Sequence, residues 1–258
     1  MQWRLLAAAA VLGAGPALAD TDAASSALAR DIFRELIEIN TTESAGRVTS
    51  ASEAMAQRLR AAGFADPDLQ VLGPNDRKKN LVVRLHGGGR HRPVLLIGHL
   101  DVVEARREDW TTDPFRFVEQ DGYFYGRGTQ DMKSGDAIMM ATLIRLKKEG
   151  FHPSRDIILA LTADEESGSS NGVEWLLKNH RELVDAEFVL NHDGNSITSD
   201  HGKPLFFEVD GTEKVYGDYL LTVTNPGGHS SLPVPDNAIY QLAAALTRLS
   251  QYEFPFEL

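Results

Sequence analysis

Three short apolar runs most constrain how this chain can fold. Residues 81–85, 94–97 and 157–161 are rich in valine, isoleucine and leucine and show no regular polar alternation. Runs of this kind predict strands that are buried on both faces. A segment with helical periodicity, residues 134–148, separates the second run from the third. Strands that alternate with helices predict an α/β fold, in which helices cover both faces of a sheet.

Helical periodicity also marks segments on either side of these runs. Residues 26–40 and 50–62 are expected to form two helices before the first strand, and residues 172–183 a helix after the third. The apolar run 188–190 then predicts a further strand. In such sheets, ligands bind at the carboxyl ends of the strands.

The character of the chain changes after Gly211. Residues 219–224 predict a strand, residues 225–228 a loop and residues 237–249 an amphipathic helix. One strand and one helix do not close a core by themselves. We therefore expect a larger domain over residues 20–212, and the start of a second, smaller domain over residues 213–258.

The first 19 residues have the layout of an export signal. Arg4 gives a positive start, residues 5–18 are rich in alanine and leucine, and residues 17–19 offer a small-x-small cleavage site. The run is too short and too rich in alanine and glycine for a membrane span. We expect a periplasmic or secreted protein with no membrane attachment after cleavage; the alternative is an amphipathic N-terminal helix.

The net charge limits the class of partner. The 258 residues carry a formal net charge of −11. Phosphate binding needs a basic surface, so such an acidic chain is a poor candidate for nucleic-acid binding and we expect no nucleic-acid partner.

The second apolar run delivers a histidine and an aspartate to one strand end. His99 and Asp101 are two residues apart, so in an extended backbone their side chains share a side. This arrangement suits a metal-binding imidazole whose other nitrogen is held by a carboxylate. The alternative is a buried histidine paired with a core aspartate.

The third run leads directly into three carboxylates, Asp164, Glu165 and Glu166. Adjacent carboxylates repel one another and lose hydration if they are packed inward, so a cation should compensate them. A surface loop is the alternative. The position after a buried strand, matching that of His99, favours the cation site.

Two further segments place acidic groups where strands or loops end. Asp131 lies in a glycine-containing loop that opens a helix, where it is a candidate ligand or an N-cap. Asp193 or His192 follows the run 188–190, and either is a ligand or a turn residue. Four such segments on one rim indicate a site for cations.

Taken together, four motifs resemble those of the M-twenty metallopeptidases. They are residues 98–101 (GHLD), 126–133 (GRGTQDMK), 164–169 (DEESGS) and 227–231 (GGHSS). That family includes carboxypeptidase S, glutamate carboxypeptidase, acetylornithine deacetylase, succinyl-diaminopimelate desuccinylase and aminoacylase. The resemblance covers roughly residues 32–249. It implies a zinc-exopeptidase-like mixed sheet followed by a ferredoxin-like α+β lid, which serves for dimerisation.

The resemblance also implies a co-catalytic pair of zinc ions, with cobalt or manganese as substitutes. His99 and Asp193 would bind one metal and Glu166 the other, while Asp131 would bridge both. Two metals about 3.5–4 Å apart activate water and bind the developing oxyanion.

Three more residues receive roles from the resemblance. Asp101 would orient His99, and Glu165 would be the general base. His229 would reach the active site of the partner in a homodimer and stabilise the oxyanion. Without the resemblance, His229 is a loop histidine on a glycine-rich turn.

One departure from the family concerns residues after the lid. Family members supply a further histidine to the second metal, and line the substrate carboxylate pocket, from a segment beyond the point where this sequence stops. The 258 residues alone are therefore expected to hold that metal weakly and to turn over slowly.

The resemblance leaves three functions open. The first is a zinc exopeptidase of carboxypeptidase S type that acts on small peptides. The second is a deacylase that cleaves N-acyl amino acids with the same site. The third, of another class, is an inactive homologue that binds peptide or metal.

Overall fold

The computed structural model describes residues 15–44, 47–166, 170–193, 197–201, 203–207, 217–229, 231–232 and 234–255. The chain divides into two compact units, Met1–Asn195 and Ser196–Leu258. The domain boundary predicted between residues 212 and 213 lies outside the described residues, as does most of the signal segment predicted for residues 1–19.

A mixed five-stranded sheet forms the centre of the first unit. Its strands are β1 (Leu69–Leu72), β2 (Asn80–Leu85), β3 (Val94–His99), β6 (Ile157–Thr162) and β7 (Phe188–Asn191). Their order is β1-β2-β6-β3-β7. The pairs β1/β2 and β2/β6 are antiparallel, whereas β6/β3 and β3/β7 are parallel. The predicted α/β class and mixed sheet are confirmed; β1 was not predicted.

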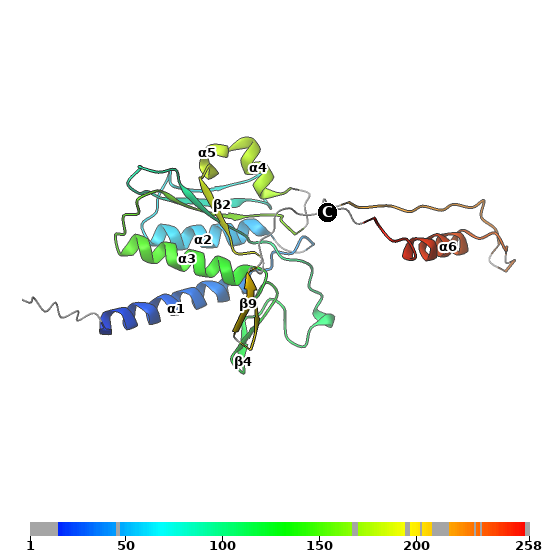
Figure 1. The fold of residues 1–258 in the computed structure, drawn as a ribbon, viewed down its shortest axis with the longest axis horizontal. Coiled ribbons are helices and arrows are strands. Elements are labelled where there is room, and N and C mark those ends of the chain that lie inside the picture. The colour runs from blue at the N-terminus through cyan, green and yellow to red at the C-terminus, as the bar shows by residue number, and fades with distance from the viewer. Residues whose placement is uncertain are drawn as a thin grey trace, which may run out of the picture. The chain divides into compact units, whose positions relative to one another are not determined.

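Helices cover both faces of this sheet (Figure 1). They are α1 (Gly15–Glu38), α2 (Val48–Ala61), α3 (Lys133–Lys148), α4 (Gly172–Asn179) and α5 (Arg181–Val184). Along β6, Leu159 and Leu161 enter the core shared with α1, α2 and α3. Ile158 and Ala160 enter a second core, shared with α4 and α5. The absence of polar alternation in this strand is therefore explained by burial on both faces.

The segment 172–183 forms two helices rather than the single one predicted. Asn171 caps α4 by accepting a hydrogen bond from the backbone N–H of Glu174, 3.0 Å away. At His180 the backbone leaves helical geometry, with φ −146° and ψ 43°. The helix ends there and α5 begins at the next residue.

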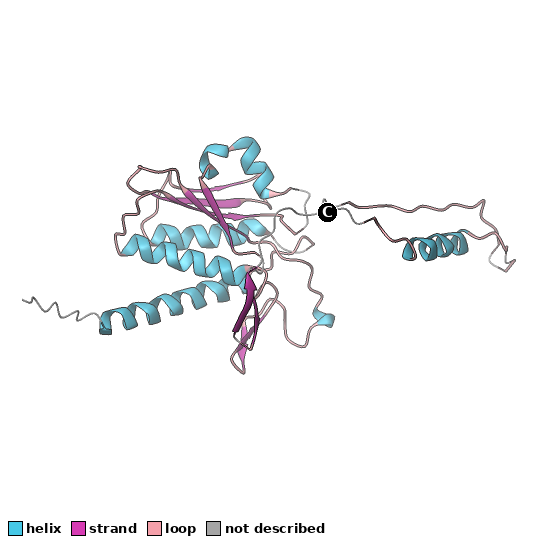
Figure 2. Cartoon of the chain, in the orientation of Figure 1, coloured by secondary structure: helices cyan, strands magenta, loops and turns pink. Residues whose placement is uncertain are grey.

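A short hairpin precedes the loop that carries Asp131. Its strands are β4 (Val118–Gln120) and β5 (Tyr123–Tyr125), drawn as magenta arrows in Figure 2. Asp121 and Gly122 form the turn, with φ of 52° and 81°, as two-residue hairpins prefer. The ring of Phe124 packs edge-on against Phe33 of α1, 5.6 Å between centroids. The hairpin was not predicted from the sequence.

The second unit contains one hairpin and one helix among its described residues. These are β8 (Ile197–Asp200), β9 (Lys203–Phe207) and α6 (Ala238–Ser250). Asn237 caps α6 by accepting from the N–H of Ile239. The strand predicted for residues 219–224 is wrong: that segment forms no strand and pairs with none of the described strands. A strand needs a neighbour to bond its backbone groups. No helix in the described ranges is long and apolar enough to cross a membrane.

Candidate metal centre

The topology of the sheet gathers the predicted site at one edge. Because β6, β3 and β7 are parallel neighbours, their carboxyl ends lie together. His99 ends β3 opposite Thr162, the last residue of β6. Ile97 lies opposite Asn191, the last residue of β7. The segments after these strands, with Glu165 and Asp193, therefore start beside His99.

Acidic oxygens surround one nitrogen of His99. The residue is 2% exposed, and its Nε2 lies 2.9 Å from Asp131 Oδ1. The carboxylates of Asp193 and Glu165 follow at 3.7 Å and 3.9 Å. One ligand atom from each of His99, Asp131 and Asp193 lies within 4.8 Å of the others. The structure thus brings these four predicted residues together from separate segments.

The other ring nitrogen of His99 fixes its tautomer. Nδ1 lies 3.0 Å from the carbonyl oxygen of Asp101, and a carbonyl oxygen only accepts hydrogen bonds. Nδ1 therefore carries the proton, and the lone pair of the neutral ring is on Nε2. Carboxylates that surround this nitrogen need positive charge beside them, supplied either by a second proton on the ring or by a metal ion. The donor set, one imidazole and carboxylates, is one that zinc accepts, so the residues fit a metal.

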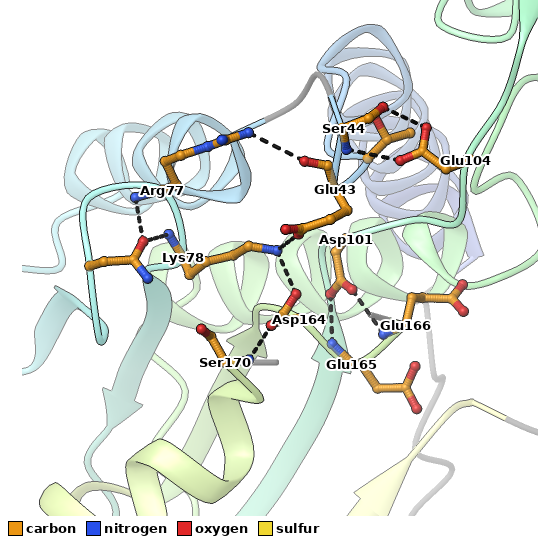
Figure 3. Close-up of polar contacts among 12 residues, drawn as sticks. Glu43, Ser44, Arg77, Lys78, Asp101, Glu104, Asp164, Glu165, Glu166 and Ser170 are labelled. Carbon is orange, nitrogen blue, oxygen red and sulfur yellow. Dashed lines mark hydrogen bonds and ion pairs between the residues drawn. The ribbon is translucent and has the colours of Figure 1, made fainter. Parts of the chain in front are cut away.

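The carboxylate of Asp101 has a different partner from the one expected. Its Oδ1 lies 3.8 Å from Nδ1 of His99, beyond hydrogen-bond distance. Instead, Oδ1 accepts a hydrogen bond from the backbone N–H of Glu165, at 3.1 Å, and Oδ2 accepts one from the backbone N–H of Glu166, at 2.9 Å (Figure 3). Asp101 therefore contacts both parts of the site. Its carbonyl oxygen holds His99, and its carboxylate holds the turn that carries Glu165 and Glu166.

The three consecutive carboxylates differ in burial: Asp164 is buried, whereas Glu165 is exposed and Glu166 is partly exposed. Asp164 is fully buried and pairs with the ammonium of Lys78, 2.5 Å away. The cation expected to compensate an inward-packed carboxylate is thus a lysine side chain at this position. The side chain of Glu165 is 48% exposed. Glu166 does not join the metal-ligand group found among the described residues, and its role at a second metal stays a prediction.

The titratable groups of the site are shifted in a direction that indicates too little positive charge. Burial lowers the pKa of His99, but Asp101, Asp136 and Glu165 outweigh it, and that pKa is raised. Burial and neighbouring carboxylates raise the pKa of Glu165, against the opposing effect of His99. The pKa of Glu166 is raised by burial and by Asp131. A bound cation would relieve this repulsion.

The structure decides two alternatives left by the sequence. The N-cap of α3 is Met132, with no side-chain cap hydrogen bond, so Asp131 is not the cap and its carboxylate faces His99. His192 packs against α3, because a Cβ placed on Gly135 would lie 2.8 Å from its Nδ1. Among the described residues, Asp193 and not His192 joins the ligand group.

Two buried charged residues beside the site were missed as site residues. Lys133 is fully buried and donates to the carbonyl oxygens of Leu36 and Ile39, at 2.8 Å and 3.0 Å. It ties the start of α3 to the end of α1. Asp136 is also fully buried, and neither carboxyl oxygen has a hydrogen-bond partner among the described residues. The sequence contained a signal for the burial of Asp136, because this residue lies four residues before Met140 and so on the apolar face of the helix.

A small cavity adjoins the acidic cluster. It measures about 60 Å³, and its lining includes His99, Glu165 and Asp193 together with the apolar side chains of Met132 and Val173. The cluster is therefore polar on one side and apolar on the other.

His229 lies in the second unit. Its Nδ1 is 2.7 Å from Ser231 Oγ, and it lines a hollow of about 390 Å³ with the N-terminal end of α6. The residue is exposed. Its role in oxyanion stabilisation stays a prediction.

Fold and site define an α/β protein with a cluster of candidate metal ligands at the carboxyl edge of its sheet. Residues 95–253 match the model of Peptidase family M20/M25/M40. The chain belongs to this family.

Curated relatives of the chain differ in the activity that their names give. It is 37% identical over 169 residues to the N-fatty-acyl-amino acid synthase/hydrolase of Xenopus tropicalis, covering 63% of the chain and 32% of that protein. It is 34% identical over 173 residues to a probable succinyl-diaminopimelate desuccinylase of Staphylococcus aureus, covering 66% and 40%. It is 38% identical over 166 residues to the probable carboxypeptidase S-like 2 of Dictyostelium discoideum, covering 61% and 32%. The chain spans only about a third to two fifths of these relatives.

Solved structures show the same fold. Human carnosine dipeptidase 1 superposes with a TM-score of 0.56 at 20% identity, over 68% of this chain and 40% of that one. The dipeptidase Dug1p of Saccharomyces cerevisiae superposes with a TM-score of 0.59 at 22% identity, over 70% and 41%.

Proposed function

We propose that the protein containing this chain hydrolyses amide bonds at a co-catalytic pair of zinc ions, with cobalt or manganese as substitutes. The observation that carries this proposal is the set of carboxylates around Nε2 of His99, with Asp131 at 2.9 Å, Asp193 at 3.7 Å and Glu165 at 3.9 Å. Membership of the peptidase family supports it.

Each predicted ligand would hold the metals from its own segment. His99 and Asp193 would hold one ion and Glu166 the other, and Asp131 would serve both. When bound, the metals supply Lewis-acid activation of water and of the scissile carbonyl. Asp101 keeps the proton of His99 on Nδ1 and so leaves Nε2 for the metal.

Glu165 is the general base. Its Oε2 faces the same nitrogen of His99 as the ligands do, and its side chain is half exposed, so substrate has access. It takes a proton from the attacking water and returns it to the leaving amine. Asp101 orients this residue too, because it accepts the backbone N–H of Glu165.

Small peptides are the first candidate substrates, cleaved from one end as by carboxypeptidase S. The carboxypeptidase S-like relative supports this choice. N-acyl amino acids are the second, supported by the relatives named as a fatty-acyl-amino acid hydrolase and a desuccinylase. Both classes present an amide next to a carboxylate, and the same ligands and base serve both.

Three further parts of the proposal concern the whole protein. Residues 1–19 act as an export signal, and the protein works in the periplasm or outside the cell. Residues 213–258 begin a ferredoxin-like lid through which two copies form a homodimer. In that dimer, His229 stabilises the oxyanion at the site of the partner.

A substrate panel with one variant tests the proposal. The full-length protein, loaded with zinc, is assayed against dipeptides and against N-acetyl, N-succinyl and long-chain N-acyl amino acids. Cleavage of dipeptides alone supports the exopeptidase, and cleavage of acyl amino acids alone overturns it in favour of the deacylase. Glu165→Gln should lower kcat at least a thousandfold while the bound zinc per chain stays unchanged. If neither class is cleaved by the wild-type protein, the inactive metal- or peptide-binding homologue replaces both.

A further inference from the structure

Two ion pairs join β2 to β6, one at each end of these antiparallel neighbours. At one end, Arg84 Nη1 lies 3.0 Å from Asp156 Oδ2. At the other, Lys78 Nζ lies 2.5 Å from Asp164 Oδ1. Both pairs link the same two strands, but only the second adjoins the turn that carries Glu165.

The pair next to the site is the more buried of the two. The side chains of Lys78 and Asp164 are 10% and 0% exposed, against 23% and 18% for Arg84 and Asp156. The ammonium of Lys78 also pairs with the carboxylate of Glu43. Burial lowers the pKa of Lys78, but its hydrogen bonds to the two carboxylates outweigh that effect and the pKa is raised. The lysine therefore stays charged, and its removal would take away the ammonium that pairs with the buried carboxylate of Asp164.

Asp164 in turn holds the backbone of the turn formed by residues 163–166. Its second carboxyl oxygen accepts the backbone N–H of Ser170, which closes the loop after the two glutamates (Figure 3). Its φ is 63°, in the left-handed region, where aspartate is tolerated better than most residues. In this conformation the side chain of Asp164 is buried, whereas the carboxylate of Glu165 faces Nε2 of His99.

The rest of the turn is held from the opposite side. Asn80, at the start of β2, accepts the N–H of Ala163 through its Oδ1 at 2.9 Å. Asp101 accepts the N–H groups of Glu165 and Glu166. Side chains from two other segments, residues 78–80 and Asp101, therefore fix this turn, and Lys78 supplies a positive charge that balances Asp164.

We propose that Lys78 is a positioning residue for the hydrolysis. Through the buried carboxylate of Asp164, it holds the turn of residues 163–166 so that Glu165 faces the candidate metal ligands around His99. Lys78 contacts neither substrate nor metal in this role. The inference rests on the proposed function for its catalytic consequence, but the placement of the turn is measurable without any reaction.

Amide hydrogen exchange of the metal-free protein measures the turn directly. In Lys78→Met and Asp164→Asn, the N–H groups of Glu165 and Glu166 should exchange at least tenfold faster than in the wild type. The matched control is Arg84→Met, which breaks the pair at the far end of the same strands and should leave these two amides unchanged. The amide of Leu159, in the middle of β6, reports the stability of the whole fold, and its exchange should change less than that of the two turn amides.

Kinetics of the full-length, zinc-loaded protein measure the consequence. Lys78→Met and Asp164→Asn should lower kcat at least tenfold with KM within twofold, and Arg84→Met should leave both within twofold. Lys78→Arg, which keeps the charge, should restore most of kcat. Asp164→Glu keeps the charge but lengthens the side chain, so it should lower kcat although the protein folds.

The outcomes separate the two proposals. If the wild type cleaves no amide, the proposed function fails and the exchange measurement alone decides the positioning role. Unchanged exchange at Glu165 and Glu166 in the lysine variant overturns that role, as does an equal loss of kcat in Arg84→Met. If Lys78→Met does not fold, Asp164→Glu decides: wild-type exchange and kcat in that variant would overturn the proposal.

Discussion

The carbonyl oxygen of Asp101 lies closer to Nδ1 of His99 than the carboxylate of the same residue does, at 3.0 Å against 3.8 Å. The two acceptors of one aspartate therefore have separate tasks. The carbonyl fixes the tautomer of the predicted metal ligand. The carboxylate holds the turn that carries the predicted base.

Asp101→Asn should separate these tasks. An asparagine keeps the carbonyl bond to His99, but its amide NH₂ replaces one of the two oxygens that accept the N–H groups of the turn. We expect kcat to fall about 100-fold, because a displaced base loses its alignment with the substrate. Zinc affinity, measured by chelator competition, should change by less than about threefold. A loss of about 10- to 100-fold in zinc affinity, typical for removal of a group that orients a metal-bound histidine, would assign the carboxylate to His99 instead.

Most of the sheet could be predicted because its strands carry their own signal. Residues 81–85, 94–97 and 157–161 are apolar except for Arg84, and burial on both faces by two layers of helices produces that pattern. The hairpin β4–β5 was missed because its strands are three residues long, too short for periodicity to register. Residues 219–224 were wrongly predicted as a strand. They have the composition of a strand, but strand pairing depends on a neighbour that composition does not reveal.

The candidate site was predictable where ligands follow strands, as His99 and Asp193 do. The residues that hold the turn with Glu165 in place could not be predicted. Lys78 lies 86 residues from Asp164 and Asn80 lies 83 residues from Ala163, and the pairing of β2 with β6 brings them into contact. Local patterns carry no information about such contacts.

Asn80→Ala should destabilise the fold. The residue is fully buried; its Nδ2 donates to the carbonyl of Leu72 and its Oδ1 accepts from the N–H of Ala163. Truncation leaves both backbone groups without partners, and each buried unpaired group costs about 1–3 kcal/mol. Urea unfolding should show a loss of about 2–4 kcal/mol in the free energy of unfolding. Gln70→Ala is the control: it removes one exposed bond to Pro67 and should cost less than about 0.5 kcal/mol.

Metal should stabilise the protein through His99. A ligand that binds only the folded state adds about 2.7 kcal/mol when its free concentration is 100 times Kd. Zinc should therefore raise Tm, and a chelator should reverse the increase. His99→Ala should abolish the effect, whereas His86→Ala, which alters an exposed histidine paired with Asp68, should retain it. An equal zinc response in both variants would show that the metal binds elsewhere.

The buried carboxyl of Asp136 predicts a dependence of stability on pH. Burial raises its pKa well above the ordinary value of 3.8; His99 and Lys133 oppose this rise, and Asp101 and Asp193 add to it. Because the folded state holds the proton more tightly than the unfolded chain does, the contribution of this group is complete below pH 3.8. It is lost as the pH rises toward the pKa of the folded state.

Asp136→Asn removes that titration without changing the size of the side chain. At pH 4 the metal-free variant and wild type should have similar free energies of unfolding, because the carboxyl is protonated in the folded state and only partly ionised in the unfolded chain. At pH 8 the variant should be the more stable of the two, because the unfolded wild-type chain has released its proton, whereas the folded state must either keep that proton or ionise a buried carboxyl. Urea unfolding at a series of pH values measures the difference. A wild type that gains stability over the variant as the pH rises would mean that Asp136 is ionised in the fold, with the ammonium of Lys133 stabilising it through the buried interior, and the sign of the argument would reverse.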